Sequence, residues 1–378
     1  MKILFTGGGS GGHVFPIIAI IREIRKFSIK KELKFFYVGP KDDFGSLLLS
    51  QEDIKITNII SGKIRRYVDK KSLFQNFIDV AIKIPFGIIQ SFFYIFFLSP
   101  DLIFSKGGFG SVPIVIAGWL LRVPVFIHES DSIPGLANKS SSKFTSKIFT
   151  SFSRTLEFDE EKMILIGNPI RKEILNGSKE KAKKIFKLTE KKPIILVLGG
   201  SQGAERINDL FLEMLPEMIQ EFEIIHQCGE KNFERVNNES KVIVKEFLQK
   251  YYHPFPFLKE EELRNAYTAC DIVVSRAGSG SIFEIAAIGK PSILIPLPES
   301  AQNHQINNAY VYAKTGAALV LEDENFTPHF FFEQLKILSS NPEKLKEMSE
   351  ATKKFAKPSA AKDIAQYILS YLNLIFVK

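Results

Sequence analysis

One pattern occurs twice along the chain: a short apolar run ends in glycines and is followed by a helical spacing of apolar residues. The apolar runs are 2–6 and 193–198, and the helical patterns are 16–25 and 205–221. Runs this short and continuous are typical of parallel strands that are buried on both faces. A second apolar run follows each helix and completes a βαβ unit. The predicted fold class is therefore α/β, with two doubly wound Rossmann-like domains.

The domain organisation follows from this restart of the pattern. Further strand-like runs extend the two halves, at 102–105, 123–128, 163–166, 271–274 and 292–295. A chain of 378 residues also exceeds the roughly 250–300 residues at which single hydrophobic cores stop growing. The turn-rich Gly167-Asn168-Pro169 predicts domains of 1–166 and 167–356. A helix predicted within 357–378 is expected to pack back on the first domain.

Glycine-rich loops follow the predicted strands. Two domains of this kind are expected to face a cleft, since open parallel sheets bind ligands beyond the carboxyl ends of their strands. Glycine-rich loops occupy four such ends, at 7–13, 106–111, 199–203 and 275–281. Glycines let a phosphate approach the backbone, and helix N-termini offer N–H donors. Together the loops indicate a phosphate-rich ligand, although each alone is also consistent with a structural turn.

The first loop fits neither of the common nucleotide motifs. A dinucleotide fingerprint needs an acid after the second strand, and this strand ends at Val38-Gly39. A P-loop needs Lys and Ser/Thr where His13 and Val14 stand. His13 lies at the start of a helix, where a histidine can act as a general base. A histidine that only hydrogen-bonds the loop is an equally good interpretation.

Three other polar groups are candidates for contacts with a sugar nucleotide. Glu284 could bind two ribose hydroxyls, although most helix carboxylates are simply solvated. His128-Glu129 follows a strand and leads to Asn138, which suits the lining of a site. The cluster 302–305 with Asn308 offers groups for sugar hydroxyls, or an amide-rich helix cap. No Asp-x-Asp motif occurs in the strand-end loops, so no metal is expected at a diphosphate.

Charge and cysteine content narrow the partners and the compartment. A net charge of +8 favours an anionic partner. No nucleic-acid-binding module is recognised, so no nucleic acid is expected. Cys228 and Cys270 have no paired spacing and indicate a reducing compartment. No signal peptide is recognised, and the longest apolar run, 84–98, is shorter than the roughly 20 residues of a spanning helix. We therefore expect no membrane-spanning segment. We also expect no cofactor.

Residues 63–98 combine basic and aromatic side chains. Lys63, Arg65 and Arg66 precede an amphipathic stretch that is rich in phenylalanine. This combination is typical of an interfacial contact with anionic lipid. Core packing beside a solvated basic loop explains the periodicity equally well.

Together these motifs resemble the MurG family of UDP-N-acetylglucosamine transferases of peptidoglycan synthesis. The matching stretches span nearly the whole chain in the family's order, at 7–16, 107–113, 128–139, 167–171, 199–208, 275–291 and 303–309. The resemblance implies a GT-B fold and inverting transfer of N-acetylglucosamine from UDP-N-acetylglucosamine (UDP-GlcNAc). The acceptor would be the muramyl 4-hydroxyl of undecaprenyl-diphosphate-linked MurNAc-pentapeptide (lipid I), which gives lipid II. The protein would be peripheral at the cytoplasmic face of the cell membrane, touching the inner membrane surface near 63–98.

The resemblance also implies roles for individual residues. His13 would be the catalytic base. The donor-binding residues would be Ser10, Gly11, Gly12, Arg171, Ser201, Phe257, Leu258, Ser279, Glu284, His304, Gln305 and Asn308. The acceptor-binding residues would be Gly9, Gly107, Gly108, His128, Glu129 and Asn138. Among these, Glu284 would hold the ribose, and the Leu258 backbone would read the edge of the uracil.

The chain departs from the family's pattern, and other classes stay open. Ser10 replaces a frequent threonine, Phe109 replaces a common tyrosine, and Ser130-Asp131 replaces a Gln-Asn pair. A UDP-GlcNAc 2-epimerase would share the two-domain plan without needing a membrane face. A dinucleotide oxidoreductase would need the missing ribose acid, and a non-catalytic lipid carrier would not need Glu284.

Overall fold

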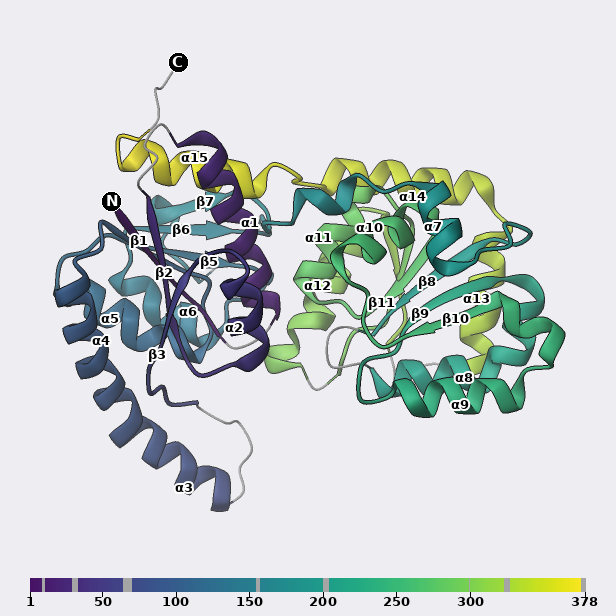
Figure 1. Ribbon diagram of the computed structural model, residues 1–378, viewed down its shortest axis with the longest axis horizontal. Helices are drawn as coiled ribbons and strands as arrows, with labels where there is room; N and C mark the ends of the chain where they lie inside the picture. The colour runs from purple at the N-terminus through teal and green to yellow at the C-terminus, as the bar shows by residue number, and fades with distance from the viewer. Residues whose placement is uncertain are drawn as a thin grey trace. The chain divides into compact units, whose positions relative to one another are not determined.

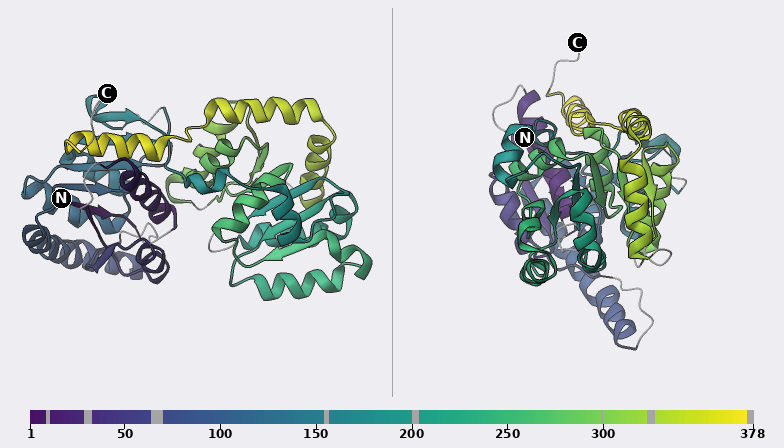
Figure 2. Two further views of the ribbon diagram at one scale, coloured as in Figure 1. Left: turned by 45° about the horizontal axis from the view of Figure 1, so that its top comes forward. Right: turned by 90° about the vertical axis from the view of Figure 1, so that its right-hand side faces the viewer.

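The computed structural model describes residues 1–8, 11–28, 33–63, 70–153, 157–199, 204–298, 300–322 and 327–374. They belong to two compact units, Met1–Arg171 with Pro358–Lys378 and Lys172–Lys357 (Figure 1, Figure 2). Each unit is a parallel sheet with helices on both faces. The prediction of two doubly wound, Rossmann-like domains is confirmed.

The described strands of the first unit form a parallel sheet in the order β3-β2-β1-β4-β5-β6-β7. They are β1 (Lys2–Thr6), β2 (Lys34–Gly39), β3 (Lys55–Asn58), β4 (Leu102–Ser105), β5 (Val125–Glu129), β6 (Lys147–Thr150) and β7 (Met163–Leu165). Because successive side chains of a strand point to opposite faces, Ile3 and Phe5 enter one core and Leu4 enters the other. The strand order reverses between β1 and β4, where open α/β sheets usually bind ligands.

Helices cover both faces of this sheet. They are α1 (Gly11–Phe27), α2 (Asp43–Ser50), α3 (Lys70–Ile78), α4 (Ile84–Leu98), α5 (Val112–Leu120), α6 (Leu136–Ser141) and α15 (Ala360–Tyr371). Short 3₁₀ turns lie at Phe109–Ser111, Ser142–Phe144 and Glu160–Lys162. The core around Ile3 and Phe5 holds residues of α1 and α15, and the opposite core holds residues of α4 and α5. The chain end therefore returns to the unit in which it began, and α15 lies beside α1 (Figure 1).

The packing of α15 leads to a stability prediction. Ile368 is fully buried against this core. Replacing it with alanine removes buried methyl groups and leaves a cavity, so we expect the free energy of unfolding to fall by about 2–5 kcal/mol. Chemical denaturation measures the change, with Ser370→Ala on the exposed side of the same helix as the control. Equal stability of the two variants would show that α15 contributes no packing energy.

A continuous helical segment joins α3 to α4 through a π-helical turn at Asp79–Lys83. Its residues Ser72–Leu98 form one helix that is long and apolar enough to cross a membrane, judged by length and composition alone. The expectation that no apolar segment reaches that length is therefore wrong. Pro85, which interrupts the apolar run 84–98, lies just after the π-helical turn, and the segment stays helical across the proline.

The described strands of the second unit form a parallel sheet in the order β10-β9-β8-β11-β12-β13. They are β8 (Ile194–Leu198), β9 (Glu223–Gln227), β10 (Tyr252–Phe255), β11 (Ile272–Ser275), β12 (Ser292–Leu294) and β13 (Ala318–Val320). Its helices are α7 (Lys179–Phe186), α8 (Glu205–Glu221), α9 (Phe233–Ile243), α10 (Glu260–Ala269), α11 (Ser279–Ile288), α12 (His304–Ala313), α13 (Pro328–Ser339) and α14 (Pro342–Phe355). Further 3₁₀ turns lie at Lys172–Leu175, Glu246–Tyr251 and Ala301–Asn303. The α8 and α13 helices share one core, and α7, α10, α11 and α12 share the other.

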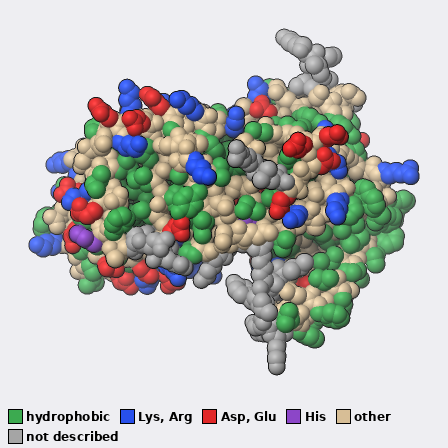
Figure 3. Space-filling model, turned by 180° about the vertical axis from the view of Figure 1, so that it is seen from behind, with side chains coloured by type: hydrophobic (Ala, Val, Ile, Leu, Met, Phe, Trp, Pro, Cys, Tyr) green, Lys and Arg blue, Asp and Glu red, His purple; other side chains and the backbone are tan. Residues whose placement is uncertain are grey.

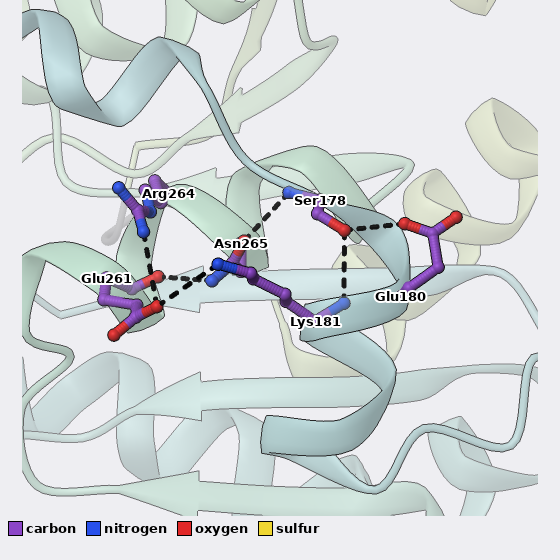
Figure 4. A network of polar contacts seen from close by, with 6 residues as sticks. All are labelled: Ser178, Glu180, Lys181, Glu261, Arg264 and Asn265. Carbon is purple, nitrogen blue, oxygen red and sulfur yellow. Dashed lines mark hydrogen bonds and ion pairs between the residues drawn. The ribbon is translucent and has the colours of Figure 1, made fainter.

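A polar network ties the start of α7 to α10 (Figure 4). Ser178 caps α7: its side chain accepts from the Lys181 N–H, and its own N–H donates to Asn265 Oδ1 over 2.9 Å. Asn265 in turn donates to the Glu261 carbonyl, and Arg264 pairs with the Glu261 carboxylate at 3.2 Å. These contacts connect the N-terminus of α7 to α10, which shares a hydrophobic core with α7 and α11.

Candidate active site

The carboxyl ends of β1 and β4 bring two glycine loops into contact in the first unit. Gly7 and Gly8 follow β1, and Gly107 and Gly108 follow Lys106 at the end of β4. A Cβ at Gly108 would lie 2.9 Å from both the N and the Cα of Gly8, and φ is +84° at Gly108 and +88° at Gly107. Only glycine fits this approach without strain. Gly7, Gly8 and Gly107 are buried, so this close packing by itself explains the glycines, and phosphate binding at the two loops stays a prediction.

The His13 imidazole packs against both loops. A Cβ at Gly8 would lie 2.9 Å from its Cε1, and one at Gly108 would lie 3.1 Å from its Nε2. Burial lowers the pKa of His13 to about 4, the Lys106 ammonium lowers it as well, and Asp131 opposes the shift. The ring is therefore neutral at pH 7, which is the form that can accept a proton. The neutral ring thus lies beside the loops, but so low a pKa makes it a weaker base than a free histidine, and the role of base stays a prediction.

His128, Glu129 and Asn138 form a buried cluster at the end of β5. The His128 ring contacts the Gly167 carbonyl through Nε2 at 2.9 Å, and burial keeps its pKa well below the usual range. The Glu129 carboxylate accepts from the Asn138 side chain at 2.9 Å and from the N–H groups of Asp131 and Gly135 at 3.0 Å. Burial raises the pKa of Glu129, and Asp131 raises it further. These hydrogen bonds connect Glu129 to the loop after β5 and to Asn138 on α6.

Lys106 is a component of this region that the sequence analysis did not select. Its side chain is 2% exposed, and within the described part of the chain its Nζ has no hydrogen-bond partner. Burial lowers the pKa of Lys106 to about 8, while Glu129 and Asp131 hold it up. In the sequence, only the position of Lys106 directly after a buried strand points to a site. Because lysines are almost always exposed, that position alone did not predict a buried ammonium.

Several predicted donor residues lie in the first unit or outside the described residues. Gly11 and Gly12 begin α1, and the Arg171 guanidinium lies over the Phe15 ring, 4.1 Å from its centroid. Arg171 is buried at the end of the first unit. The predicted site residues Gly9, Ser10 and Ser201 fall outside the described ranges.

In the second unit, the start of α11 is open in the way a phosphate site requires. Ser279 begins the helix after Gly278, which provides no side-chain cap, and the first turn contains no acid. A Cβ at Gly278 or Gly280 would meet nothing within 4 Å. Packing within the protein therefore does not require glycine at these two positions, whereas a ligand close to the helix N-terminus would.

Glu284 lies further along α11 and is half-buried. The hydroxyl of Tyr267, a fully buried residue of α10, donates to Glu284 Oε2 over 3.4 Å. This hydrogen bond leaves the other Glu284 oxygen, Oε1, without a contact from Tyr267. The sequence predicted the carboxylate but gave no indication of Tyr267, because the two residues lie on different helices.

Phe257 and Leu258 follow β10, as expected for residues beside a base. The Leu258 N–H, however, donates to Gln227 Oε1 over 3.1 Å, and the Leu258 side chain is buried. The uracil of a bound nucleotide could accept a hydrogen bond from the Leu258 N–H only by displacing the Gln227 carboxamide. Gln227, at the end of β9, is a residue that sequence reasoning missed.

Some of the polar side chains at the start of α12 already make hydrogen bonds within their own loop. Gln305 Oε1 accepts from the Leu297 N–H over 3.1 Å, and His304 Nε2 contacts Gln302 Oε1 at 2.8 Å. Asn308 is fully buried. Gln302 and Asn303 both have φ of +54°, a left-handed conformation that is costly outside glycine. Asparagine adopts this conformation readily, so the strain falls on Gln302, and the sugar contact stays a prediction.

No group of three or more His, Cys, Asp or Glu residues within the described ranges could hold a metal ion. The groups that could attract an anion are the backbone N–H groups at the starts of α1 and α11 and, in the first unit, the cations Lys106 and Arg171. Such groups can stabilise a diphosphate by themselves.

Comparison with known proteins supplies the family. Residues 3–150 match the glycosyltransferase family 28 N-terminal domain, and residues 194–364 match its C-terminal domain. A Bacillus thuringiensis subsp. konkukian protein named UDP-N-acetylglucosamine--N-acetylmuramyl-(pentapeptide) pyrophosphoryl-undecaprenol N-acetylglucosamine transferase 2 is 40% identical, over 97% of this chain and 99% of that protein. A Clostridium tetani transferase of the same name, without the number, is 41% identical over 91% of both chains.

Solved structures agree with the fold. Acinetobacter baumannii MurG superposes with a TM-score of 0.73 at 24% identity, covering 98% of this chain and 99% of that one. A UDP-GlcNAc 2-epimerase from Neisseria meningitidis has a TM-score of 0.68 at 15% identity, covering 98% and 100%. The fold is thus shared by transferases and epimerases, whereas the sequence relatives are transferases. The chain belongs to glycosyltransferase family 28 and, within it, to the MurG family of UDP-N-acetylglucosamine--N-acetylmuramyl-(pentapeptide) pyrophosphoryl-undecaprenol N-acetylglucosamine transferases.

Proposed function

We propose that the chain transfers N-acetylglucosamine from UDP-GlcNAc to the muramyl 4-hydroxyl of lipid I, with inversion, and so forms lipid II for peptidoglycan. The observation that carries this function is 40% identity to a transferase named for the reaction, over 97% of the chain. The geometry of both units is compatible with it, because each presents an anion-binding surface at the carboxyl ends of its strands.

In this mechanism the first unit activates the acceptor. Neutral His13 accepts the proton of the 4-hydroxyl on a ring nitrogen while the hydroxyl oxygen attacks the anomeric carbon of the donor. The bond from that carbon to the phosphate oxygen breaks, and UDP leaves with the electron pair. The Gly107-Gly108 backbone supports the acceptor, and Glu129 keeps Asn138 in place beside it.

The second unit binds the donor. The open N-terminus of α11 at Ser279 stabilises the diphosphate, whose charge increases as UDP leaves. Glu284, held by Tyr267, accepts hydrogen bonds from two ribose hydroxyls. Phe257 and Leu258 lie beside the uracil, and His304, Gln305 and Asn308 contact the sugar. Roles for Arg171, Ser201 and the loop from Ser10 to Gly12 at the diphosphate stay predictions from the sequence, because Arg171 and Gly12 belong to the first unit and Ser10 and Ser201 lie outside the described residues.

Incubation with UDP-GlcNAc, with and without a short-chain lipid I analogue, tests the proposal by mass spectrometry. A disaccharide-lipid product with UDP, formed only when the acceptor is present, supports the transferase. Formation of UDP-N-acetylmannosamine without acceptor would instead assign the epimerase class, which shares this fold. No product from either reaction would overturn both assignments.

The relatives act on a lipid-linked acceptor, so association of the protein with a membrane surface is expected. We assign the contact to the segment from Lys63 to Leu98. Its exposed hydrophobic side chains are Leu73, Phe74, Phe77, Val80, Ile82, Phe86, Ile89, Phe93, Phe96 and Phe97. Figure 3 shows hydrophobic side chains gathered over this part of the first unit, at the lower right of the view. Lys63 is exposed nearby, whereas Arg65 and Arg66 fall outside the described residues.

Two features favour a helix that lies on the membrane over one that crosses it. Asp79, in the middle of the segment, is buried and pairs with Lys83 at 2.6 Å, and such a charged pair is expensive at the centre of a bilayer. The inner side of α4 is also fixed to the first unit, because Ser91 and Ile95 are buried and a Cβ at Gly87 would collide with the Ile60 carbonyl. The protein is therefore peripheral in this proposal.

The membrane contact gives a prediction. Phe86, Phe93 and Phe97 are more than half exposed, so changing all three to serine removes apolar area from the contact with little loss of packing. We expect the partition coefficient onto anionic vesicles to fall by at least about tenfold, since burying one such side chain is worth about 1.5–3 kcal/mol. Co-sedimentation measures it, with Phe247→Ser on the second unit as the control. Unchanged partitioning would reject this face as the contact.

The cytoplasmic side of the membrane is supported by the cysteines. Cys228 and Cys270 are both free and buried, and burial raises the pKa of each thiol, to about 11 and about 12. Free thiols fit a reducing compartment.

A further inference from the structure

Gln227 lies at the carboxyl end of β9, where its backbone is held on both sides. It pairs with Leu198 of β8 and with Phe255 of β10. Its carbonyl also accepts from the Gly199 N–H over 3.2 Å, which ties it to the loop after β8. The strand end is therefore rigid, and the Gln227 side chain can change its hydrogen-bond partner by rotation alone, without movement of the backbone.

The Gln227 carboxamide binds a backbone donor of the segment that leads into α10. Gln227 is 5% exposed, and its Oε1 accepts from the Leu258 N–H over 3.1 Å. This contact joins positions that are 31 residues apart in the sequence. Glutamine is mostly an exposed residue, whereas a buried backbone N–H must have a partner. Gln227 thus supplies an acceptor for the Leu258 N–H from within the protein.

The Leu258 N–H lies close to the proposed ribose contact. The Leu258 side chain belongs to the same buried core as Tyr267, whose hydroxyl donates to Glu284. Phe257, directly before Leu258, is only partly buried. The core therefore connects Leu258 to the carboxylate that is proposed to bind the ribose, while the neighbouring residue still reaches the surface.

A carboxamide has the same hydrogen-bonding groups as one edge of uracil. In both, an oxygen that accepts and a nitrogen that donates are bonded to the same carbon. In uracil these groups are O4 and N3–H, whereas cytosine has a donating amino group in place of O4. An N–H that binds Gln227 Oε1 can therefore bind uracil O4 instead, but it cannot bind the amino group of cytosine.

We propose that the Gln227 carboxamide takes the place of the uracil edge in the free protein. When the donor binds, uracil O4 accepts the hydrogen bond of the Leu258 N–H, and the Gln227 side chain rotates away. The inference rests on the proposed function for the identity of the donor nucleotide. Because one hydrogen bond must break before the other forms, Gln227 lowers the affinity for UDP and restricts the exchange to bases with a carbonyl at this position.

Two substitutions with opposite expected effects test the exchange. Gln227→Met keeps the length of the side chain but removes the carbonyl, so uracil no longer competes with an internal acceptor. We expect the Kd for UDP to fall by on the order of 3- to 10-fold, as for one neutral hydrogen bond. Gln227→Glu strengthens the internal contact, because a carboxylate is a better acceptor, and the Kd should rise by a similar factor. Calorimetry measures both, with Gln220→Met, at an exposed position of α8, as the control.

CDP separates the base edge from the rest of the nucleotide. It has the same ribose and diphosphate as UDP, so an added charge or a shifted loop changes both affinities alike. Cytosine offers no acceptor to the Leu258 N–H, so CDP leaves Gln227 in place, and its Kd should stay within about twofold in Gln227→Met. The ratio of UDP to CDP affinity should rise in Gln227→Met and fall in Gln227→Glu. An unchanged ratio, or weaker UDP binding in both variants, would overturn the proposal and leave Gln227 as a structural residue.

A measurement on the unmodified protein covers the case in which neither variant folds. Nuclear magnetic resonance follows the Leu258 amide and the Gln227 carboxamide in protein with isotope-labelled leucine and glutamine. Saturating UDP should shift the resonances of both groups, and CDP should shift them far less. Gln227 resonances that stay in place while UDP binds would overturn the exchange and leave the proposed function intact. If UDP does not bind at all, the proposed function fails, and the exchange fails with it.

Discussion

Replacing His13 with alanine should lower kcat by on the order of 10²–10⁴-fold, because the attacking hydroxyl loses its general base. UDP binding should persist, since the donor residues Glu284 and Leu258 lie in the second unit. Initial rates at saturating donor and acceptor measure the loss, and calorimetry with UDP measures the binding. His329→Ala, at an exposed histidine of α13, is the matched control.

The pH profile separates a base from a histidine that only packs the loop. Burial lowers the pKa of His13 to about 4, so the group is deprotonated and active above that pH and loses activity as pH falls through about 4. In kcat/KM the acid limb should therefore lie well below the value of about 6.5 that is usual for histidine. A limb near 6.5, or near-normal turnover in His13→Ala, would remove this residue from the role of base.

Replacing Glu284 with alanine should raise the KM for UDP-GlcNAc by on the order of 10- to 100-fold, since hydrogen bonds to a charged group contribute about 1.5–3 kcal/mol each. The kcat at saturating donor should change far less, because the ribose is remote from the reacting carbon and contributes to binding in ground and transition states alike. Steady-state kinetics with varied donor measure both constants. Glu217→Ala, at an exposed position of α8, controls for the loss of one carboxylate.

The contact from Tyr267 sharpens the Glu284 experiment. Its hydroxyl donates to one oxygen of Glu284, so Tyr267→Phe should raise the donor KM in the same direction but by less. An unchanged donor KM in Glu284→Ala would reject the ribose contact, whatever the result for Tyr267.

Local sequence patterns predicted the architecture because buried parallel strands have a local signature. The runs that became β1, β8 and β11 are short and apolar, and each lies in a sheet as predicted. The edge strands β3, β10 and β13 and the interior strand β6 were missed, whereas the edge strand β7 was predicted. The β3 sequence, Lys55 to Asn58, has one large apolar residue, and its strand geometry depends on pairing with β2.

The helical segment of the first unit shows the limit of local rules. Local sequence limited the apolar run to 84–98, which is the length of α4 alone. In the structure a π-helical turn joins α3 to α4, and Asp79 is buried and paired with Lys83. Only the fold shows that these two charged residues pair within one continuous helix.

For the candidate site too, some features follow from local sequence and others only from the tertiary structure. The sequence by itself determined the two doubly wound units, the glycine loops at strand ends and the identities of His13 and Glu284 as candidates, because strand periodicity and backbone freedom are local properties of a chain. Only the tertiary structure decided that Lys106 is buried beside His13, that Gln227 holds the Leu258 N–H and that Tyr267 holds Glu284. Those contacts join residues from different elements, and the burial that sets their charge and hydrogen bonding arises only when the elements pack.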